Sequence, residues 1–314
     1  MRYLRNLTSK QLRGKTALLR VDFNVENKRD AYRLQASLPT INFLLARGAK
    51  VVILSHRGRP KGAEKKFSLR PYAAFIKARL KKQVVFLPHF DFPKLRQQIK
   101  QSRETIFLIE NLRFLKGETE NDLKFGKALA SLGDIYVNEA FAVSHRKNAS
   151  VCAITDYLPS YAGLLLEKEI TALDEIIRSK KQPLVAILGG AKVKDKLPVI
   201  ERFLHKASYI LLGGGIANTF AKAKGLNIGQ SLYKPAMVRK ARHLLHKKNI
   251  IIPFDFMLEK DRILDIGPLT AARFAGIISK ARVVFWNGPL GYFEDKRFKK
   301  GSEAVARAIA ESRA

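Results

Sequence analysis

Short apolar runs rich in β-branched residues alternate with longer amphipathic stretches along this chain. In the first half, the apolar runs occupy residues 16–21, 51–54, 84–87, 106–109 and 135–137. The stretches between them at 34–47, 71–82 and 122–132 carry apolar residues at helical spacing. This alternation is typical of parallel strands joined by crossover helices. The pattern therefore predicts an α/β fold.

The second half repeats the pattern, with apolar runs at 184–188, 209–212, 250–252, 262–266 and 283–286. A single hydrophobic core rarely grows beyond about 250 to 300 residues, so a chain of 314 residues favours two lobes. A candidate helix at 164–180, bracketed by Pro159 and Pro183, would join them. We predict a first lobe at 1–163, a connecting helix at 164–181 and a second lobe at 182–314.

The chain is strongly basic, with 59 Lys and Arg against 27 Asp and Glu and a net charge of +32. Such a charge attracts small phosphorylated substrates, but it is equally compatible with nonspecific binding of nucleic acid. A third alternative is that most of the lysines only form a solvated surface. No apolar run reaches the roughly 18 to 20 residues of a membrane-spanning helix. The single cysteine, Cys152, excludes an internal disulfide and a thiolate metal site. We therefore expect a soluble, cytoplasmic protein.

Polar and basic side chains in the first half follow the predicted strands directly. They are Asp22, Asn24, His56, Arg59, Arg113, His145 and Arg146. The carboxyl ends of parallel strands face one crevice, so these groups can converge although they lie far apart in sequence. Arginine suits such a site because its planar fork donates paired hydrogen bonds to carboxylate or phosphate. Each arginine alone could be a solvated surface charge, but together they predict an anion pocket.

Two glycine-containing segments follow strands in the second half. Gly189 and Gly190 precede a predicted helix start at which Lys192 and Lys196 lie one turn apart. Free amides and lysines at a helix N-terminus favour phosphate, although an ordinary βα turn with exposed lysines is the alternative. The second segment, residues 213–215, departs from the dinucleotide-binding spacing because Asn218 replaces the third glycine. With no Walker A string either, any nucleotide site here is neither a P-loop nor a dinucleotide fold.

Nine strings along the chain resemble the signature segments of the phosphoglycerate kinase family, in the family's order. They are RVDFNV at 20–25, RLQASLPTI at 33–41, SHRGRPKG at 55–62, ENLRF at 110–114, LGDIYVNEAF at 132–141, GGAKVKDKL at 189–197, GGGIANTF at 213–220, LDIGP at 264–268 and WNGPLGYFE at 286–294. The resemblance implies two Rossmann-like lobes, each a parallel sheet flanked by helices. It also implies reversible phosphoryl transfer between 1,3-bisphosphoglycerate with ADP and 3-phosphoglycerate with ATP, using Mg²⁺, in glycolysis.

The same resemblance assigns roles to individual residues. The glycerate substrate would be held by Asp22, Asn24, Arg33, His56, Arg59, Arg113 and Arg146, and the nucleotide by Lys192, Lys196, Gly213, Gly214, Asn287 and Glu294. Arg33 would also stabilise the phosphoryl group in transfer, and Lys192 would contact it, so these two are the expected catalytic residues. No metal-ligating side chain is assigned. Catalysis would consist of positioning and charge stabilisation.

The chain also departs from the family pattern. Segment 26–32 is short, Glu139 stands for the usual Asp, and Ala142, Val143 and Ser144 replace the usual Gly-Thr-Ala. After a predicted helix at 301–313 the sequence ends at Ala314, without the family's Gly-Gly-Gly-Asp segment and tail. We therefore expect an incomplete second lobe and phosphoryl transfer slowed by at least about a thousandfold.

An incomplete lobe would leave an exposed sheet edge at the strand leading to Phe285, which favours self-association. Two other functions stay open at this point. A catalytically silent relative would keep the anion pockets as a binding or scaffold protein. A nucleic-acid-binding protein is supported by the charge alone, because no recognised nucleic-acid motif is present.

Overall fold

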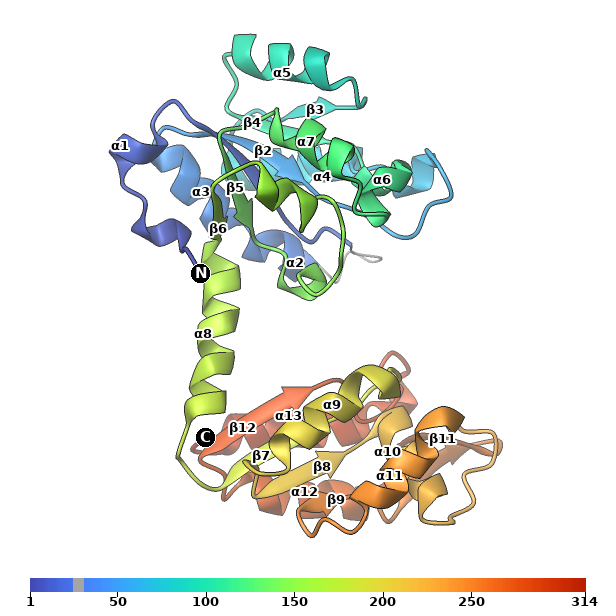
Figure 1. Cartoon of the computed structure of the whole chain (residues 1–314). Coiled ribbons are helices and arrows are strands. Elements are labelled where there is room, and N and C mark those ends of the chain that lie inside the picture. The colour runs from blue at the N-terminus through green and yellow to red at the C-terminus, as the bar shows by residue number, and fades with distance from the viewer. Residues whose placement is uncertain (25–30) are drawn as a thin grey trace. The chain divides into compact units, whose positions relative to one another are not determined.

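The protein is described by a computed structural model that covers residues 1–24 and 31–314 (Figure 1). It divides into two compact units, Met1–Leu173 and Asp174–Ala314. Helix α8 (Leu164–Arg178) crosses the boundary between them. The predicted boundaries 1–163, 164–181 and 182–314 stay a prediction. Residues 26–30 of the expected short loop lie outside the described residues.

The first unit is built on a six-stranded sheet in which every pair is parallel, in the order β3-β4-β2-β1-β5-β6. Its strands are β1 (Thr16–Arg20), β2 (Lys50–Leu54), β3 (Val85–Leu87), β4 (Ile106–Ile109), β5 (Ile135–Asn138) and β6 (Ser160–Ala162). The register pairs Arg20 with Leu54 on one side and with Asn138 on the other. Three central strands therefore end level with one another, and the segments that follow them start at one edge of the sheet.

Two hydrophobic cores cover the two faces of this sheet, because successive side chains along a strand point to opposite faces. Ala17 and Leu19 of β1 belong to one core, and Leu18 belongs to the other. The helices of the unit are α1 (Ser9–Leu12), α2 (Ala31–Ala36), α3 (Leu38–Ala46), α4 (Arg70–Leu80), α5 (Phe92–Gln101), α6 (Lys116–Thr119) and α7 (Leu123–Ala130). Helices α3 and α4 pack on the first face, and α5 and α7 pack on the second (Figure 1).

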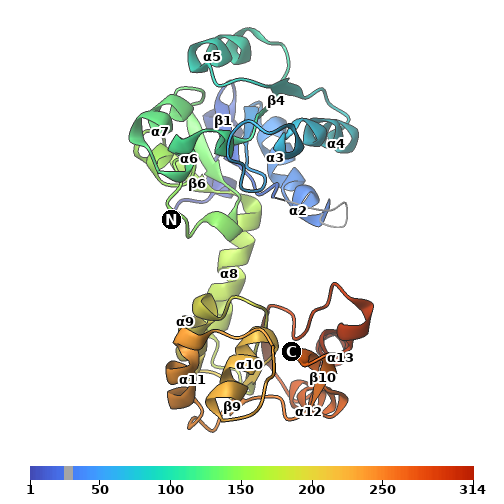
Figure 2. The ribbon, with the colours of Figure 1, turned by 90° about the vertical axis from the view of Figure 1, so that its right-hand side faces the viewer.

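The second unit carries a four-stranded parallel sheet in the order β12-β7-β8-β9. Its strands are β7 (Leu184–Leu188), β8 (Tyr209–Leu212), β9 (Ile250–Ile251) and β12 (Val283–Asn287). Helices α9 (Val193–Phe203), α10 (Gly214–Ala223) and α11 (Val238–Leu244) cover one face. Helices α12 (Pro268–Ile278) and α13 (Lys300–Glu311) cover the other (Figure 2). Among the described residues, β12 pairs with β7 alone and forms an edge of the sheet.

These two parallel sheets flanked by helices confirm the predicted α/β fold class. The expectation for 262–266 was wrong in one respect, because β11 (Arg262–Ile266) does not join the parallel sheet. It pairs antiparallel with β10 (Phe256–Glu259) in a separate two-stranded hairpin. The predicted helix at 34–47 is divided into α2 and α3 around Ser37, where Pro39 occupies the first turn of the second helix.

A buried carboxylate marks the start of α8. Glu139, which is 2% exposed, accepts hydrogen bonds from the backbone N–H of Leu165 at 3.0 Å and of Leu166 at 3.1 Å. The Thr40 hydroxyl also donates to it. Burial raises the pKa of the Glu139 carboxyl, and these three donors oppose that rise. The residue that departs from the family pattern therefore caps the helix that runs from the first unit into the second.

Candidate functional site

A basic cavity of about 390 Å³ opens in the first unit near the carboxyl ends of its strands. Five cationic side chains line it: Arg59, Lys61, Arg113, Lys116 and Arg146. Thr119 and Asn148 add polar groups, and none of the described residues that line it is a carboxylate. Three of the cations were predicted from the sequence, whereas Lys61 and Lys116 were missed. A cavity of this composition has the charge and the donors to bind an anion.

Arg113 is a half-buried cation of this cavity. It lies in the 3₁₀ helix η4 (Leu112–Phe114), and its Nη1 donates to the carbonyl of Gly58 at 2.6 Å. Its buried Nε has no hydrogen-bond partner among the described residues. Burial first, and then the charges of Arg146 and Arg20, lower the pKa of Arg113 to about 10. Because Arg146 and Arg20 add positive charge that Glu118 only partly opposes, a bound anion would relieve both the repulsion and the unpaired donor.

His56, which follows β2, is held in one protonation state. The side chain is 1% exposed, and its Nδ1 lies 3.0 Å from Nη2 of Arg20. A guanidinium can only donate, so Nδ1 accepts and the imidazole proton resides on Nε2. Burial, followed by the charges of Arg20, Arg113, Arg146 and Arg33, lowers the pKa of His56 far below its ordinary value. His56 is therefore a neutral hydrogen-bond donor.

Arg20 itself is anchored in the interior. Its Nε donates to Ser150 Oγ at 2.8 Å, and its Nη2 lies 3.8 Å from the carboxylate of Glu118. Ser150 in turn donates its hydroxyl to Glu118 at 2.7 Å and its backbone N–H to the same carboxylate at 2.9 Å. Arg20 and Glu118 are 1% and 0% exposed, respectively. The network orients the guanidinium of Arg20 toward His56. The sequence did not predict this role, because Arg20 is the last residue of a buried strand.

The remaining substrate residues predicted in the first unit lie around the same strand ends. Asp22 accepts an ion-paired hydrogen bond from Arg33 of α2 at 3.2 Å. Asn24 accepts one from the backbone N–H of Gly58 at 2.7 Å, so it fixes the loop that also meets Arg113. Arg33 does not line the basic cavity, but its charge acts on His56. The strand ends thus gather all seven predicted substrate residues in one region of the first unit.

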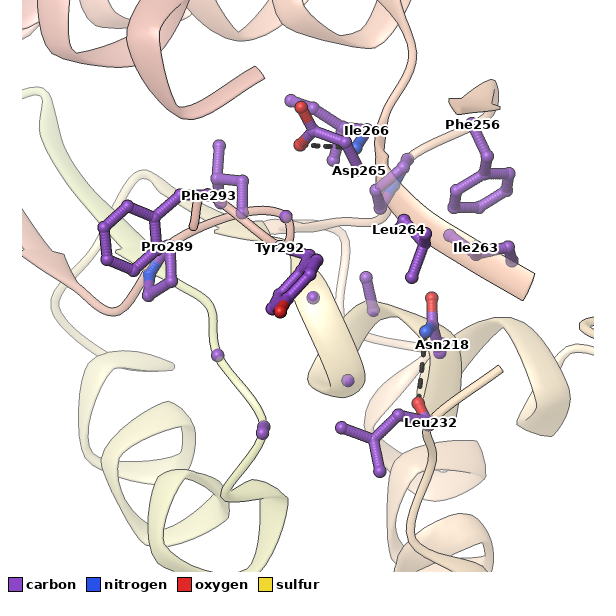
Figure 3. Close-up of a pocket in the computed structure, with 18 of the residues that line it drawn as sticks. Asn218, Leu232, Phe256, Ile263, Leu264, Asp265, Ile266, Pro289, Tyr292 and Phe293 are labelled. Carbon is purple, nitrogen blue, oxygen red and sulfur yellow. Dashed lines mark hydrogen bonds between the residues drawn. The ribbon is translucent and has the colours of Figure 1, made fainter. Parts of the chain in front are cut away.

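The second unit has a cavity of about 450 Å³ (Figure 3). Glycines after β7 and β8 form one wall, and residues of β11 and the segment after β12 form the others. We call it the glycine-walled cavity; its lining includes Gly190, Gly214, Gly215, Asn218, Leu232, Phe256, Ile263, Leu264, Pro289, Leu290, Tyr292 and Glu294. Its composition is mainly apolar with few polar side chains, which is typical of sites for flat organic ligands.

The glycines of this wall are required by close approach of backbone to backbone. Gly214 has φ +56°, and a Cβ at its position would lie 2.9 Å from the backbone nitrogen of Gly190. Gly213 is different, because its Cβ would lie 2.4 Å from the side chain of Leu290. Gly213 therefore lets β8 pack against the segment after β12, and it does not line the cavity.

The predicted phosphate-binding residues lie outside the lining of this cavity. Lys192 occupies the N-cap position of α9, and Lys196 is half-buried one turn later. Burial lowers the pKa of the Lys196 ammonium, an effect that Asp195 opposes and Lys192 adds to. Asn287 is exposed at the end of β12, where its carbonyl accepts from the backbone N–H of Gly189 at 3.0 Å. Of the six predicted nucleotide residues, the cavity is lined by Gly214 and Glu294.

The described residues do not fit a resident metal site. They include no group of three or more His, Cys, Asp or Glu side chains placed to hold a metal ion. Asp265, a carboxylate in the lining of the glycine-walled cavity, is already bonded to the backbone N–H groups of Ile266 at 2.9 Å and Gly301 at 2.8 Å. The part of the chain that the structure covers also has no helix long and apolar enough to span a membrane.

The sequence matches the family model of phosphoglycerate kinase over residues 7–314. The chain belongs to the phosphoglycerate kinase family. Phosphoglycerate kinase from Rubrobacter xylanophilus is 41% identical, over 98% of this chain and 85% of the relative. That from Coprothermobacter proteolyticus is 39% identical, over 98% of this chain and 86% of the relative. The resemblance inferred from the nine strings is therefore confirmed.

Solved structures of phosphoglycerate kinases share the fold. The enzyme from Pyrococcus horikoshii aligns with a TM-score of 0.88 at 32% identity, over all of this chain and 87% of that one. The enzyme from Coxiella burnetii aligns with a TM-score of 0.78 at 36% identity, over 99% and 86%. Membership of this family makes the chain a phosphotransferase, so the predicted enzyme class is confirmed. The alternative of a silent binding protein is not favoured.

Proposed function

We propose that the chain binds the phosphoglycerate substrate at the basic cavity of the first unit and the adenine nucleotide in the glycine-walled cavity of the second. In the reaction, an oxygen of the ADP β-phosphate attacks the phosphorus of the acyl phosphate of 1,3-bisphosphoglycerate. The bond from that phosphorus to the carboxyl oxygen breaks, and the 3-phosphoglycerate carboxylate leaves with the electron pair. No proton transfer and no covalent enzyme intermediate are needed.

The observation that carries the substrate assignment is the accumulation of positive charge around Arg113. Its pKa is lowered to about 10 by burial and by neighbouring arginines, and one of its donors is buried without a partner in the part of the chain that the structure describes. A substrate with a phosphate and a carboxyl group supplies the anionic acceptors that these donors lack. Neutral His56, with its proton on Nε2, would donate one further hydrogen bond without adding charge.

The nucleotide assignment rests on the shape and composition of the glycine-walled cavity. Gly214 lets the backbone approach a flat ring, and the exposed carboxylate of Glu294 suits the ribose hydroxyl groups. Lys192 and Lys196 are placed by α9 to neutralise phosphate, and the lowered pKa of Lys196 is consistent with a partly desolvated site. Gly213 and Asn287 remain proposed nucleotide residues, and Arg33 and Lys192 remain the proposed catalytic residues. Mg²⁺ remains a proposed cofactor of the phosphoryl transfer.

We further propose a glycolytic role in the cytoplasm, in line with the family. Self-association through the edge of β12 and salt-sensitive, charge-driven binding of nucleic acid also stay predictions. The affinity for nucleic acid should fall steeply as the salt concentration rises. This dependence distinguishes nucleic-acid binding from substrate binding.

Calorimetric titration of 3-phosphoglycerate into the purified chain tests the substrate site. Arg146→Ala removes a cation from the lining and should weaken binding by about 10- to 100-fold, because it deletes charge-assisted hydrogen bonds. Arg96→Ala on the exposed surface of α5 is the matched control and should leave binding unchanged. Unchanged affinity in Arg146→Ala would show that the substrate binds elsewhere. A coupled assay with ATP then reports phosphoryl transfer itself.

A further inference from the structure

Asn218 is the buried polar side chain of the glycine-walled cavity that retains an unused hydrogen-bonding atom. It lies on α10 and is 3% exposed. Its Nδ2 donates to the carbonyl of Leu232 at 3.1 Å, whereas its Oδ1 is buried with no partner among the described residues. An unsatisfied buried acceptor costs about 1 to 3 kcal/mol, so its presence in a folded protein requires an explanation.

The bond to Leu232 decides where the free acceptor points. Figure 3 shows the Asn218 nitrogen turned toward the Leu232 carbonyl and Oδ1 on the opposite side of the amide, directed toward Ile263 and Leu264. Both of those residues line the cavity. Rotating the amide by half a turn would bring two oxygens together, so the bond keeps Oδ1 facing the cavity.

The other polar side chains of the lining cannot take the same role. Both oxygens of the Asp265 carboxylate are bonded to backbone N–H groups. Tyr292 and Glu294 are exposed, so water can satisfy their polar atoms. Apolar side chains such as Leu264 and Leu290 line the same cavity. Among the described side chains, a ligand in this cavity therefore meets apolar walls and the one fixed amide acceptor of Asn218.

We propose that Asn218 is a specificity-determining residue that accepts a hydrogen bond from the exocyclic amino group of the nucleobase. This inference rests on the proposed nucleotide site. Adenine presents a 6-amino donor to the acceptor, whereas hypoxanthine and guanine present a 6-oxo acceptor at the same place. Two facing oxygens would both stay unpaired and would repel one another, so the cavity selects adenine nucleotides over 6-oxopurine nucleotides.

The first experiment uses the unaltered protein and three nucleotides: ADP, inosine diphosphate and purine riboside diphosphate, which has no 6-substituent. We expect calorimetry to show ADP binding about 10- to 100-fold more tightly than inosine diphosphate, with the unsubstituted purine closer to inosine diphosphate. Equal binding of ADP and inosine diphosphate overturns the role of Asn218 but leaves the nucleotide site intact. Absence of binding by all three overturns the nucleotide site as well.

The second experiment separates recognition from support of the 232–234 segment. Asn218→Leu keeps the volume and removes both polar atoms, so we expect it to lower ADP affinity and leave inosine diphosphate affinity unchanged or improved. The control is Thr219→Val, because Thr219 Oγ1 accepts from the backbone N–H of Lys234 at 3.1 Å and does not line the cavity. If Thr219→Val reproduces the altered base preference, or if Asn218→Leu weakens both nucleotides equally, Asn218 acts by supporting the segment and the proposal fails.

Discussion

The guanidinium of Arg20 lies 3.0 Å from Nδ1 of His56, and both side chains are 1% exposed. This contact makes Nδ1 an acceptor and leaves the histidine without a position for a second proton. Three further arginines act on the same imidazole: Arg113, Arg146 and Arg33. His56 is thus kept neutral by burial and by the surrounding arginines, two of which, Arg113 and Arg146, line the basic cavity.

The pH dependence of stability follows from the lowered pKa of His56. Folded His56 stays neutral, whereas unfolded His56 binds a proton below about pH 6.5, so the unfolded state binds more protons there. The free energy of unfolding should therefore fall as the pH is lowered from 6.5, by about 2 kcal/mol at pH 5. His56→Asn keeps an acceptor and does not titrate, so urea denaturation of this variant should lack that decline.

The control for this prediction is His145→Asn, which changes an exposed histidine of the same unit. It should retain the decline between pH 6.5 and 5. If His56→Asn and the unaltered protein lose stability in parallel, His56 is not the group responsible. Proton NMR offers a direct check, because the ring of His56 should not titrate between pH 5 and 8.

Arg20 and Glu118 form a buried pair whose partners depend on one another. Arg20→Met removes the ion-pair partner of the buried Glu118 carboxylate, which should lower the free energy of unfolding by about 3 to 5 kcal/mol. The double variant with Glu118→Gln should recover part of this loss, because the unpaired charge is then removed. Arg178→Met, in an exposed pair with Asp174, should cost less than about 1 kcal/mol. Equal losses in Arg20→Met and the double variant would contradict the pairing.

The sequence predicted the central strands well because each is a continuous apolar run buried on both faces. Strands at 106–109 and 184–188 have the predicted bounds. Helix α5 was not predicted, because only a few apolar residues, chiefly Leu95 and Ile99, lie on its buried side. Asp91 and Pro93 are nevertheless typical of a helix start. Strand β6 has only three residues, Ser160–Ala162, and no apolar run at all.

Contacts between segments that are distant in sequence were harder to predict than the strands themselves. The run at 262–266 gave no sign that its partner would be the antiparallel strand β10, because local pattern does not specify pairing. The grouping of basic residues after separate strands could be predicted, since parallel strands end at a common edge. The network behind Arg20 could not, because Glu118 and Ser150 lie far away in sequence. Likewise, the sequence showed Asn218 only as the residue that replaces the third glycine of a motif. Its hydrogen bond to the Leu232 carbonyl could not be predicted.

Gly214 provides the most direct test of the glycine-walled cavity. Gly214→Ala places a Cβ in a backbone conformation that costs an L-residue about 1 to 2 kcal/mol, and this atom would lie 2.9 Å from the nitrogen of Gly190. We expect the variant to lose stability by at least that amount and to bind ADP about tenfold or more weakly, because the wall of the cavity must shift.

The matched substitution is Gly276→Ala in α12, where a Cβ meets no atom within 4 Å. Replacing glycine by alanine inside a helix should raise the free energy of unfolding by about 0.5 to 1 kcal/mol and leave ADP binding unchanged. Comparing the two variants by urea denaturation and by calorimetry separates the general effect of adding a methyl group from the effect at the cavity wall. If Gly214→Ala binds ADP as tightly as Gly276→Ala does, the nucleotide does not lie against this wall, and the assignment of the glycine-walled cavity is wrong.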